Sequence, residues 1–297
     1  MPKLAILIPT YNGASHIEQA LMSLANQPLL EYGVETVLLH DDHSTDQTVA
    51  IAHACWNNAI PLSVMVSDQN QGLFANHNAG LKALLAQPPE WIFIFHQDDY
   101  VKEQWLESMV AEIHQATRKT ATIACSYDGF LDDGTVVPGD NREGIIVIPG
   151  IVSHVRGTLL KGGWWHLSGC ILNVEVLKAV GLFDAALPHM GDWEWTLRCF
   201  AHGYTILYVP RTLIGWRQHH DSYSAHSMRT VGYARQLIEV LQRYKYVLSR
   251  SEYLRWHGQQ AYYALRRTAR AVQLRNLTFF KAGVEIMLLI GTNAVRY

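Results

Sequence analysis

Residues 91–99 read WIFIFHQDD, an apolar run that passes directly into four polar residues. Five consecutive apolar side chains are typical of a strand buried on both faces, as in a parallel sheet. The polar side chains from His96 to Asp99 then lie where that strand ends. Because ligands of open α/β sheets bind beyond the carboxyl ends of the strands, this stretch predicts both a fold class and the position of a site.

The same pattern recurs through the first 125 residues. Short apolar runs rich in valine and isoleucine alternate with segments of helical length, in which apolar residues recur at intervals of three or four. The expected strands are Leu4–Ile8, Val34–Leu39, Leu62–Val66, Trp91–Phe95 and Thr122–Cys125. Polar turns follow the first four, at residues 9–13, 40–46, 68–72 and 96–99. We therefore predict an α/β fold whose sheet is flanked by helices.

The composition is that of a globular protein from a reducing compartment. The chain has 297 residues, 49% hydrophobic and 17% charged, which is enough to bury a substantial core. The four cysteines, Cys55, Cys125, Cys170 and Cys199, are far apart and lack a zinc-ligand spacing. The apolar run at the N-terminus is too short for a signal peptide. We therefore expect a cytoplasmic protein with free thiols.

The C-terminal quarter of the chain differs from the rest. Residues 1–224 carry 12 Lys+Arg against 23 Asp+Glu, whereas residues 225–297 carry 12 against 3. The segment from Met228 onward lacks proline and has a helical apolar pattern, which predicts a domain at 1–225 and a basic helical subdomain at 226–297. Its most apolar stretch, Ala282–Gly291, is about half the length that spans a bilayer. Such a surface suits an anionic membrane leaflet or nucleic acid, or is simply a solvated helix face.

Residues 128–165 contain turn signals and short β-like runs, and we expect a hairpin or a loop there. We expect this region to shape one side of the site.

Two aspartate pairs follow expected strands: Asp98 with Asp99, and Asp41 with Asp42. Carboxylate oxygens are the ligands that Mg²⁺ and Mn²⁺ prefer when they hold a diphosphate. An aspartate at a strand's end can also accept hydrogen bonds from a pyrimidine or a ribose. For a single pair, a helix N-cap is the alternative, and Asp99 precedes an expected helix. Two such turns favour a nucleotide site with a metal.

Several motifs follow one another along the chain. They are Ile8-Pro9-Thr10-Tyr11-Asn12, Asp41-Asp42-x-Ser44-Thr45-Asp46, His96-Gln97-Asp98-Asp99, Ser168-Gly169, Val180-Gly181-Leu182-Phe183-Asp184, and Asp192-x-Glu194-Trp195 with Arg198 and Gly203. In this order they resemble glycosyltransferase family 2, over roughly residues 3–225. The resemblance implies the GT-A fold, which is a Rossmann-like mixed sheet flanked by helices, a nucleotide-sugar donor, and inverting transfer by one direct displacement.

The resemblance also implies roles for individual residues. The donor-binding residues would be Thr10, Tyr11, Asn12, Asp41, Asp42, Asn78, Gln97 and Arg217, and the metal ligands would be Asp98, Asp99 and His219. Asp192 becomes the catalytic base that removes the acceptor proton, with Glu194 as the second candidate. The alternative is an N-cap residue plus a first-turn acid of a helix that runs to Phe200. Arg198 is expected to be a structural partner of such an acid.

One position departs from the family pattern. The metal motif usually begins with aspartate, where this chain has His96. If its imidazole coordinates, it favours Mn²⁺ or a softer ion over Mg²⁺; otherwise Asp98 is the sole anchor in this motif.

The stretch Trp216-Arg217-Gln218-His219 is similar to one in bacterial rhamnosyltransferases of surface-polysaccharide biosynthesis, which implies dTDP-rhamnose as donor. A UDP-hexose or UDP-aminosugar donor remains open. The implied acceptor is a saccharide or a lipid-linked saccharide at the inner face of the cytoplasmic membrane, with peripheral contact through the C-terminal helices and no nucleic acid. The alternatives from other classes are a nucleotidyltransferase, disfavoured because residues 8–20 contain no Arg or Lys, and a noncatalytic binding module.

Overall fold

The computed structural model describes residues 1–131, 133–162, 165–219, 230–273, 275 and 277–294. In these residues one mixed sheet has the strand order β3-β2-β1-β4-β9-β6-β10-β5, while β7 pairs with β6 and β8 with β10. The strands are β1 Leu4–Thr10, β2 Val34–Asp41, β3 Leu62–Val66, β4 Trp91–Ile94, β5 Tyr100–Val101, β6 Thr120–Leu131, β7 Val136–Val137, β8 Ile146–Ile148, β9 Ile171–Asn173 and β10 Thr205–Gln218. All five strands expected from the sequence are therefore confirmed.

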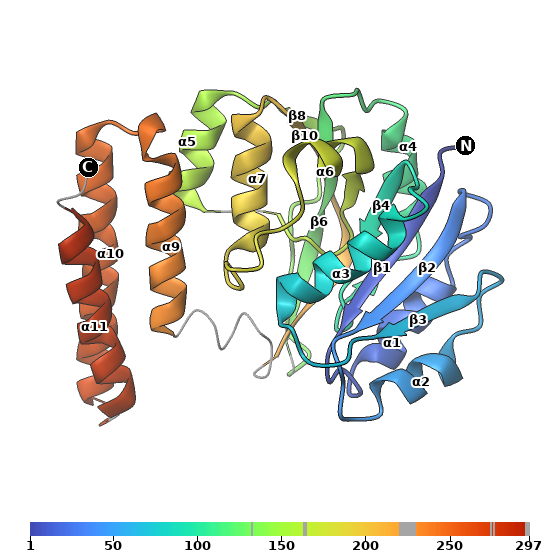
Figure 1. Cartoon of the computed structure of the whole chain (residues 1–297), viewed down its shortest axis with the longest axis horizontal. Coiled ribbons are helices and arrows are strands. Elements are labelled where there is room, and N and C mark those ends of the chain that lie inside the picture. Colours follow the sequence, from blue (N-terminus) through green and yellow to red (C-terminus); the bar gives the residue numbers. More distant parts are fainter. Residues whose placement is uncertain (132, 163–164, 220–229, 274, 276, 295–297) are drawn as a thin grey trace.

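Helices cover both faces of the sheet (Figure 1). They are α1 Ile17–Ala25, α2 Thr48–Cys55, α3 Leu73–Leu85, α4 Trp105–Ile113, α5 Val152–Lys161, α6 Val174–Val180, α7 Gly191–Ala201, α9 Val231–Tyr244, the 3₁₀ turn Lys245–Val247, α10 Arg250–Gln273 and α11 Leu277–Ala294. The side chains of α1, α2 and α4 share one core with Leu4, Ile6 and Ile8 of β1. Those of α3, α6 and α7 share another with Ala5 and Leu7, because alternate side chains of a strand point to opposite faces.

The strand register brings the expected turns together. β1 pairs in parallel with both β2 and β4, and Thr10 lies opposite Asp41. The sheet is mixed because β9 runs antiparallel between β4 and β6. The short β5 pairs antiparallel with β10, which places the turn after β4 beside the end of β10. The carboxyl ends of β1, β2 and β4 and the end of β10 thus meet at one edge.

The described residues of the region 128–165 contain more regular structure than a loop. β7 pairs with β6, which confirms a hairpin, but helix α5 was not expected from the sequence. This helix buries Val155 and Leu159, one helical turn apart, and so needs a tertiary partner to form. A Gly157 at its centre weakened the helical signal.

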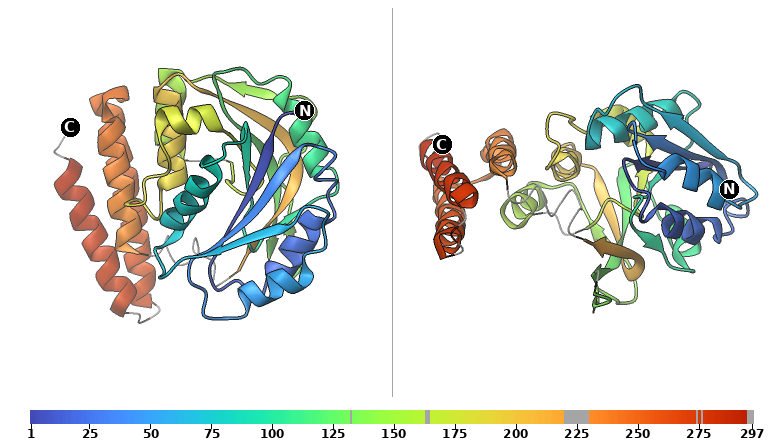
Figure 2. Two further views of the ribbon diagram at one scale, coloured as in Figure 1. Left: turned by 45° about the vertical axis from the view of Figure 1, so that its right-hand side comes forward. Right: turned by 90° about the horizontal axis from the view of Figure 1, so that it is seen from below.

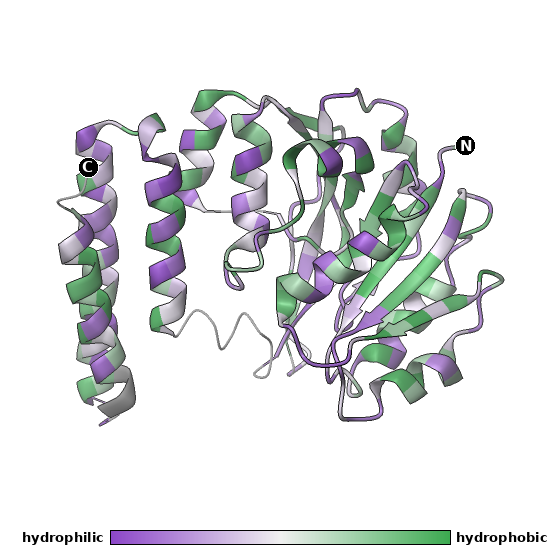
Figure 3. Ribbon diagram, in the orientation of Figure 1, coloured by the Kyte–Doolittle hydropathy of each residue, from purple (hydrophilic) through white to green (hydrophobic). Residues whose placement is uncertain are grey.

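The C-terminal helices α9, α10 and α11 lie side by side at the end of the molecule remote from β1–β3 (Figures 1 and 2). They pack with α5 and α7 in a third core that includes Trp193, Tyr253 and Trp256. Figure 3 shows apolar residues running along β1 and β2, whereas polar and apolar residues alternate along the C-terminal helices. Within the described residues, no helix has the length and apolar character needed to cross a membrane. The expected boundary between residues 225 and 226 lies outside the described residues.

Candidate functional site

The turns after β1 and β2 are joined by side-chain hydrogen bonds. The Thr10 hydroxyl donates to Asp41 Oδ1 at 3.0 Å, and Ser44 donates to the same carboxylate from both its backbone N–H and its hydroxyl. Asp42 accepts from the backbone N–H groups of Gln71 and Gly72 at 2.9 and 2.8 Å. Both carboxylates are buried, so the structure assigns them to shaping these turns. Their contact with a donor remains a prediction.

Tyr11 and Asn12 form the exposed part of this edge. The Tyr11 side chain is 43% exposed, and Asn12 adopts a left-handed backbone with φ of 44°. The Gln97 side chain holds Tyr11 by accepting from its N–H at 2.9 Å and donating to its carbonyl at 3.0 Å. The backbone of Tyr11 is therefore fixed, and its side chain remains exposed to a ligand. The amide of Gln97 is used in these two hydrogen bonds.

Asn78, which was expected to bind the donor, is hydrogen-bonded to another part of the protein. Its amide donates to the carbonyl of Phe183 at 2.7 Å and accepts from the N–H of the same residue at 3.1 Å. This pair of bonds fastens the loop before α7 to α3. The amide would have to give up both bonds to reach a donor, so the geometry gives it a structural role.

Asp98 and His219 form a pair across the sheet edge. His219 Nε2 and Asp98 Oδ2 lie 3.2 Å apart although the two residues are 121 positions apart in the chain. The Asp98 side chain is 25% exposed. Burial acts to raise its pKa, but the hydrogen bond with His219, together with weaker contributions, outweighs burial, so the pKa of Asp98 lies below its usual value. An ionised carboxylate beside an imidazole suits Mn²⁺.

Arg217 sits next to this pair at the end of β10. Its Nε donates to the Asp98 carbonyl at 3.1 Å, its terminal nitrogen contacts Gln19, and its guanidinium lies 4.8 Å from the centre of the Phe130 ring. A planar cation fixed in this way can bind phosphate oxygens with its remaining N–H donors.

Asp99 lies in a different environment from Asp98. The carboxylate is 2% exposed, and Oδ1 accepts from the Arg217 backbone N–H at 3.0 Å. Burial and the neighbouring Asp98 charge hold the pKa of Asp99 well above its usual range. The second oxygen, Oδ2, faces His96 Nδ1 at 3.9 Å and His166 Nδ1 at 3.7 Å. Asp99 therefore belongs to a different ligand group from the Asp98–His219 pair.

His166 was missed by the sequence analysis. It lies in the segment before β9, 70 residues from His96, and a lone histidine in a tryptophan-rich stretch has no metal-ligand spacing. Only the antiparallel insertion of β9 beside β4 brings it to this edge.

The motif Ser168-Gly169 positions the same segment. The Ser168 hydroxyl accepts from the His96 N–H at 3.0 Å, and Gly169 donates to the Ile94 carbonyl at 2.7 Å. Gly169 has a φ of +81°, and a Cβ there would lie 2.4 Å from Ile214, so a side chain is excluded on both counts. These contacts anchor the segment against the end of β4.

Asp192 is in the first turn of α7, which packs against α3 through Gly191 and Phe74. Its Oδ1 accepts from the Trp193 backbone N–H at 2.8 Å. Burial raises the pKa of Asp192 above its usual value. A partly buried carboxylate with a raised pKa is a stronger base than a free one, which fits proton removal from a hydroxyl.

Glu194 is buried and paired within the protein, and its role as a second base remains a prediction. It is 3% exposed, pairs with Arg198 at 2.7 Å and accepts from the Tyr244 hydroxyl at 2.9 Å. Arg198 also donates to the carbonyls of Val180 and Leu182. The expected structural pairing of Arg198 with an acid is present, and it fixes the loop that leads to Asp192.

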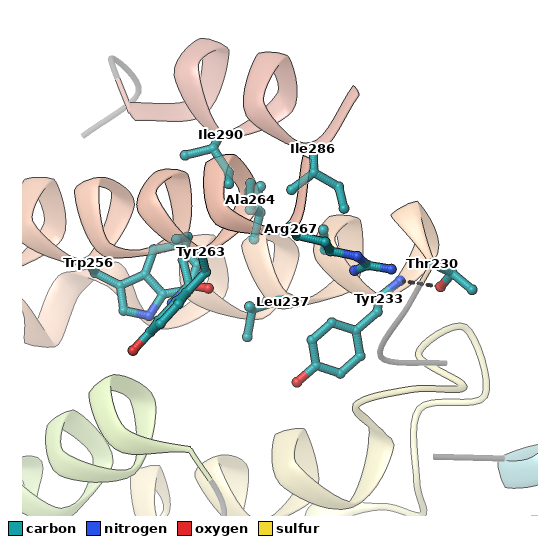
Figure 4. Close-up of a pocket in the computed structure, with 12 residues that line it drawn as sticks. Thr230, Tyr233, Leu237, Trp256, Tyr263, Ala264, Arg267, Ile286 and Ile290 are labelled. Atoms are coloured by element: carbon teal, nitrogen blue, oxygen red, sulfur yellow. Dashed lines mark hydrogen bonds between the residues drawn. The ribbon is translucent and has the colours of Figure 1, made fainter. Parts of the chain in front are cut away.

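A cavity of about 180 Å³ lies between α9, α10 and α11 (Figure 4). Tyr233, Leu237, Trp256 and Tyr263 are among its lining residues, and Arg267 adds a cation. Burial raises the pKa of Tyr233, and the Asp192 charge raises it further. The cavity is mostly apolar and distinct from the edge that carries Asp98.

Comparisons with known proteins identify relatives of the chain. A family model described as glycosyl transferase family 2 matches residues 5–166, more than half of the chain. The chain is 24% identical over 245 residues to glycosyltransferase AglE of Haloferax volcanii, an alignment that covers 78% of this chain and 69% of AglE. It is 28% identical over 229 residues to EpsH of Bacillus subtilis, covering 74% of this chain and 62% of EpsH. The chain thus spans about two thirds of the length of these relatives.

Solved structures show the same fold. The Staphylococcus aureus protein TarS in complex with UDP-GlcNAc has a TM-score of 0.60 at 17% identity, covering 94% of this chain and 89% of that one. GalNAc-T7 with UDP, GalNAc and Mn²⁺ has a TM-score of 0.59 at 15% identity, covering 91% of this chain and 51% of that one. These similarities confirm the GT-A architecture with C-terminal helices.

Proposed function

Since the chain belongs to glycosyltransferase family 2, we propose that it moves a hexose or an aminosugar from a uridine diphosphate donor to a saccharide or lipid-linked saccharide. The donor proposal is supported by TarS, a structural neighbour solved with UDP-GlcNAc. The dTDP-rhamnose donor implied by the Trp216–His219 stretch has no such support among these relatives. The observation that carries the proposal is the Asp98–His219 pair beside Arg217, at the edge where the β1 and β2 turns meet.

Each part of the reaction has a candidate residue in this arrangement. Asp98 and His219 would hold Mn²⁺ or Mg²⁺, which when bound neutralises charge on the departing diphosphate. Arg217 would bind phosphate oxygens, and Tyr11 offers an exposed ring to the base. Asp192 would take the proton of the acceptor hydroxyl as that oxygen attacks the anomeric carbon from the face opposite the diphosphate.

We expect Asp98→Asn to weaken Mn²⁺-dependent UDP binding by about tenfold or more, because the amide cannot replace the carboxylate as a metal ligand. The measurement is a calorimetric titration of the purified protein with UDP, dTDP and GDP, each with Mn²⁺, with Mg²⁺ and with EDTA. Asp68→Asn is the matched control, since Asp68 is an exposed carboxylate on the neighbouring turn.

The pattern of binding decides the proposal. Metal-dependent binding of UDP alone supports it, whereas tighter binding of dTDP would restore the rhamnose hypothesis. UDP affinity that is indifferent to both metal and Asp98 would remove the Asp98–His219 pair from the site.

The acceptor side is proposed from α7 and the C-terminal helices. The apolar cavity between these helices is lined by Tyr233 and Arg267 (Figure 4), and the charge of Asp192 acts on Tyr233. An apolar space lined by a cation suits an amphiphilic anionic acceptor, as a lipid-linked saccharide would be.

One face of α10 supports a peripheral membrane location. Leu254, Leu265 and Val272 are 45–58% exposed, and their spacing of 11 and 7 residues aligns them along the helix. The exposed residues Arg255, Arg266 and Arg270 form a second line alongside. The described residues from 230 to 294 contain ten Lys+Arg and three Glu. This combination is typical of a helix that lies on an anionic lipid surface.

We expect the triple variant Arg255→Gln, Arg266→Gln, Arg270→Gln to bind anionic vesicles on the order of 100-fold more weakly, since each basic residue near such a surface contributes about 1 kcal/mol. Co-sedimentation with phosphatidylcholine vesicles with and without phosphatidylglycerol measures this. The matched control is Lys82→Gln, Arg118→Gln, Lys119→Gln, which removes three exposed cations from the sheet domain.

Equal loss in both triple variants would mean that overall charge, and not this face, drives binding. Absence of vesicle binding, with a wild-type dimer that the α10 variant dissociates, would identify the face as an interface between copies of the chain.

A further inference from the structure

Three potential metal ligands converge next to the Asp98–His219 pair without being part of it. The ligand atoms of His96, Asp99 and His166 all lie within 4.8 Å of one another. Asp99 Oδ2 is 3.9 Å from His96 Nδ1 and 3.7 Å from His166 Nδ1. In a tetrahedral zinc site with bonds near 2 Å, ligand atoms are roughly 3.3 Å apart, so small side-chain rotations would close the group.

Two of the three atoms that face the centre of this group make no hydrogen bond with another described residue. They are Asp99 Oδ2 and His166 Nδ1, and both are buried. Asp99 is 2% exposed; its Oδ1 accepts from the Arg217 backbone N–H, and the Ser168 hydroxyl also interacts with the carboxyl. Buried polar atoms nearly always have a partner, so two unpartnered atoms 3.7 Å apart point to a ligand between them.

The remaining contacts leave the ligand atoms oriented inward. The far nitrogen of His96, Nε2, lies 3.4 Å from His77 Nε2, which leaves Nδ1 toward Asp99. The His166 ring packs at 5.2 Å from the Trp216 ring and 5.7 Å from Tyr127. Aromatic packing of this kind fixes the ring plane, as a preorganised metal ligand requires.

We propose that His96, Asp99 and His166 form a second metal site, which binds a borderline transition-metal ion, Zn²⁺ in the first instance, independently of nucleotide. Two imidazoles and one carboxylate are a ligand set for Zn²⁺ or Co²⁺ and a poor one for Mg²⁺, which prefers oxygen. Three protein ligands leave a fourth position for water. The His96 and His166 side chains are 23% and 21% exposed, which provides a path for the ion.

Such an ion would join two segments that the chain keeps apart. His96 and Asp99 belong to the turn between β4 and β5, whereas His166 belongs to the segment before β9. Because Asp99 also holds the Arg217 backbone, the site would brace the position of Arg217 next to the donor pair. This role rests on the proposed function, but metal binding itself does not.

The test is a titration of the full chain, free of any histidine tag and stripped with EDTA, with Co²⁺ and then Zn²⁺ in the absence of nucleotide. We expect one equivalent of Co²⁺ to give the visible absorption of a low-coordinate ion and Zn²⁺ to displace it. His166→Gln should lose this binding by about 10-fold or more while Mn²⁺-dependent UDP binding persists. Asp98→Asn should show the reverse, and the exposed His53→Gln should match the wild type.

His96→Gln repeats the test if His166→Gln does not fold, as judged by circular dichroism. The proposal is overturned if wild-type protein binds neither ion without nucleotide, or if Asp98→Asn removes both kinds of binding, which would mean one shared site. Loss of UDP binding with Co²⁺ binding intact would contradict the proposed function and leave this site standing.

Discussion

Asp192→Asn is expected to lower the transfer rate by about 100- to 10,000-fold, the usual contribution of a general base, while UDP affinity stays within a few-fold. The asparagine oxygen can still accept from the Trp193 N–H as Asp192 does at 2.8 Å, so the helix start is retained. The amide, however, cannot remove a proton from the acceptor hydroxyl. Single-turnover transfer and calorimetric UDP binding measure the two quantities separately.

The pH profile provides a second readout for Asp192. Burial raises its pKa, and the base acts only when ionised, so wild-type kcat/KM should fall as the pH drops through that raised value. The residual kcat/KM of Asp192→Asn should not show this decrease at low pH. Turnover close to wild type in the variant would mean that another group removes the proton.

Glu194→Gln is expected to act on stability instead. Leaving Arg198 unpaired inside the protein should cost about 3 kcal/mol, at the lower end for a broken buried ion pair. A loss of that size corresponds to a drop in Tm of roughly 6–12 °C in a chain of this length. Thermal unfolding by circular dichroism checks it, and transfer activity at low temperature should remain because Asp192 is intact.

The matched control is Glu175→Gln, which removes the same charge from the exposed Glu175–Lys178 pair. Exposed pairs contribute little, so its Tm should stay near that of the wild type. If Glu194→Gln kept full stability and lost activity, Glu194 and not Asp192 would be the base. The two variants therefore distinguish the roles of Asp192 and Glu194: loss of activity without loss of stability identifies the base.

The strands were predictable because their signal is local. The expected strands, from Leu4–Ile8 to Thr122–Cys125, are short runs dominated by apolar residues. The signal is strongest in β1 and β4, whose residues are all buried. The short strand β9 and helix α5 were not predicted. β9 has three residues, and α5 packs against α7, α9 and the 3₁₀ turn, so neither has a sufficient signal of its own in the sequence.

The sequence predicted which residues lie near the site better than it predicted which groups their side chains contact. The motif that contains Asp98 lies at the sheet edge as expected, and His219 meets it there. Yet the amide of Gln97 holds Tyr11, that of Asn78 holds Phe183, and Glu194 is bound by Arg198. A motif indicates that a side chain is near a site. It does not tell whether that side chain is free to bind a ligand or is bonded to other residues of the protein.

The sequence by itself determined the alternation of strands and helices and the polar turns at the strand ends, because periodicity and turn chemistry act over a few neighbouring residues. The tertiary structure decided which of those turns meet. His166 reaches His96 because β9 enters the sheet between β4 and β6, and His219 reaches Asp98 because β5 pairs with β10. Strand order is set by the packing of the whole chain, so contacts between residues 70 or 121 positions apart have no local signature.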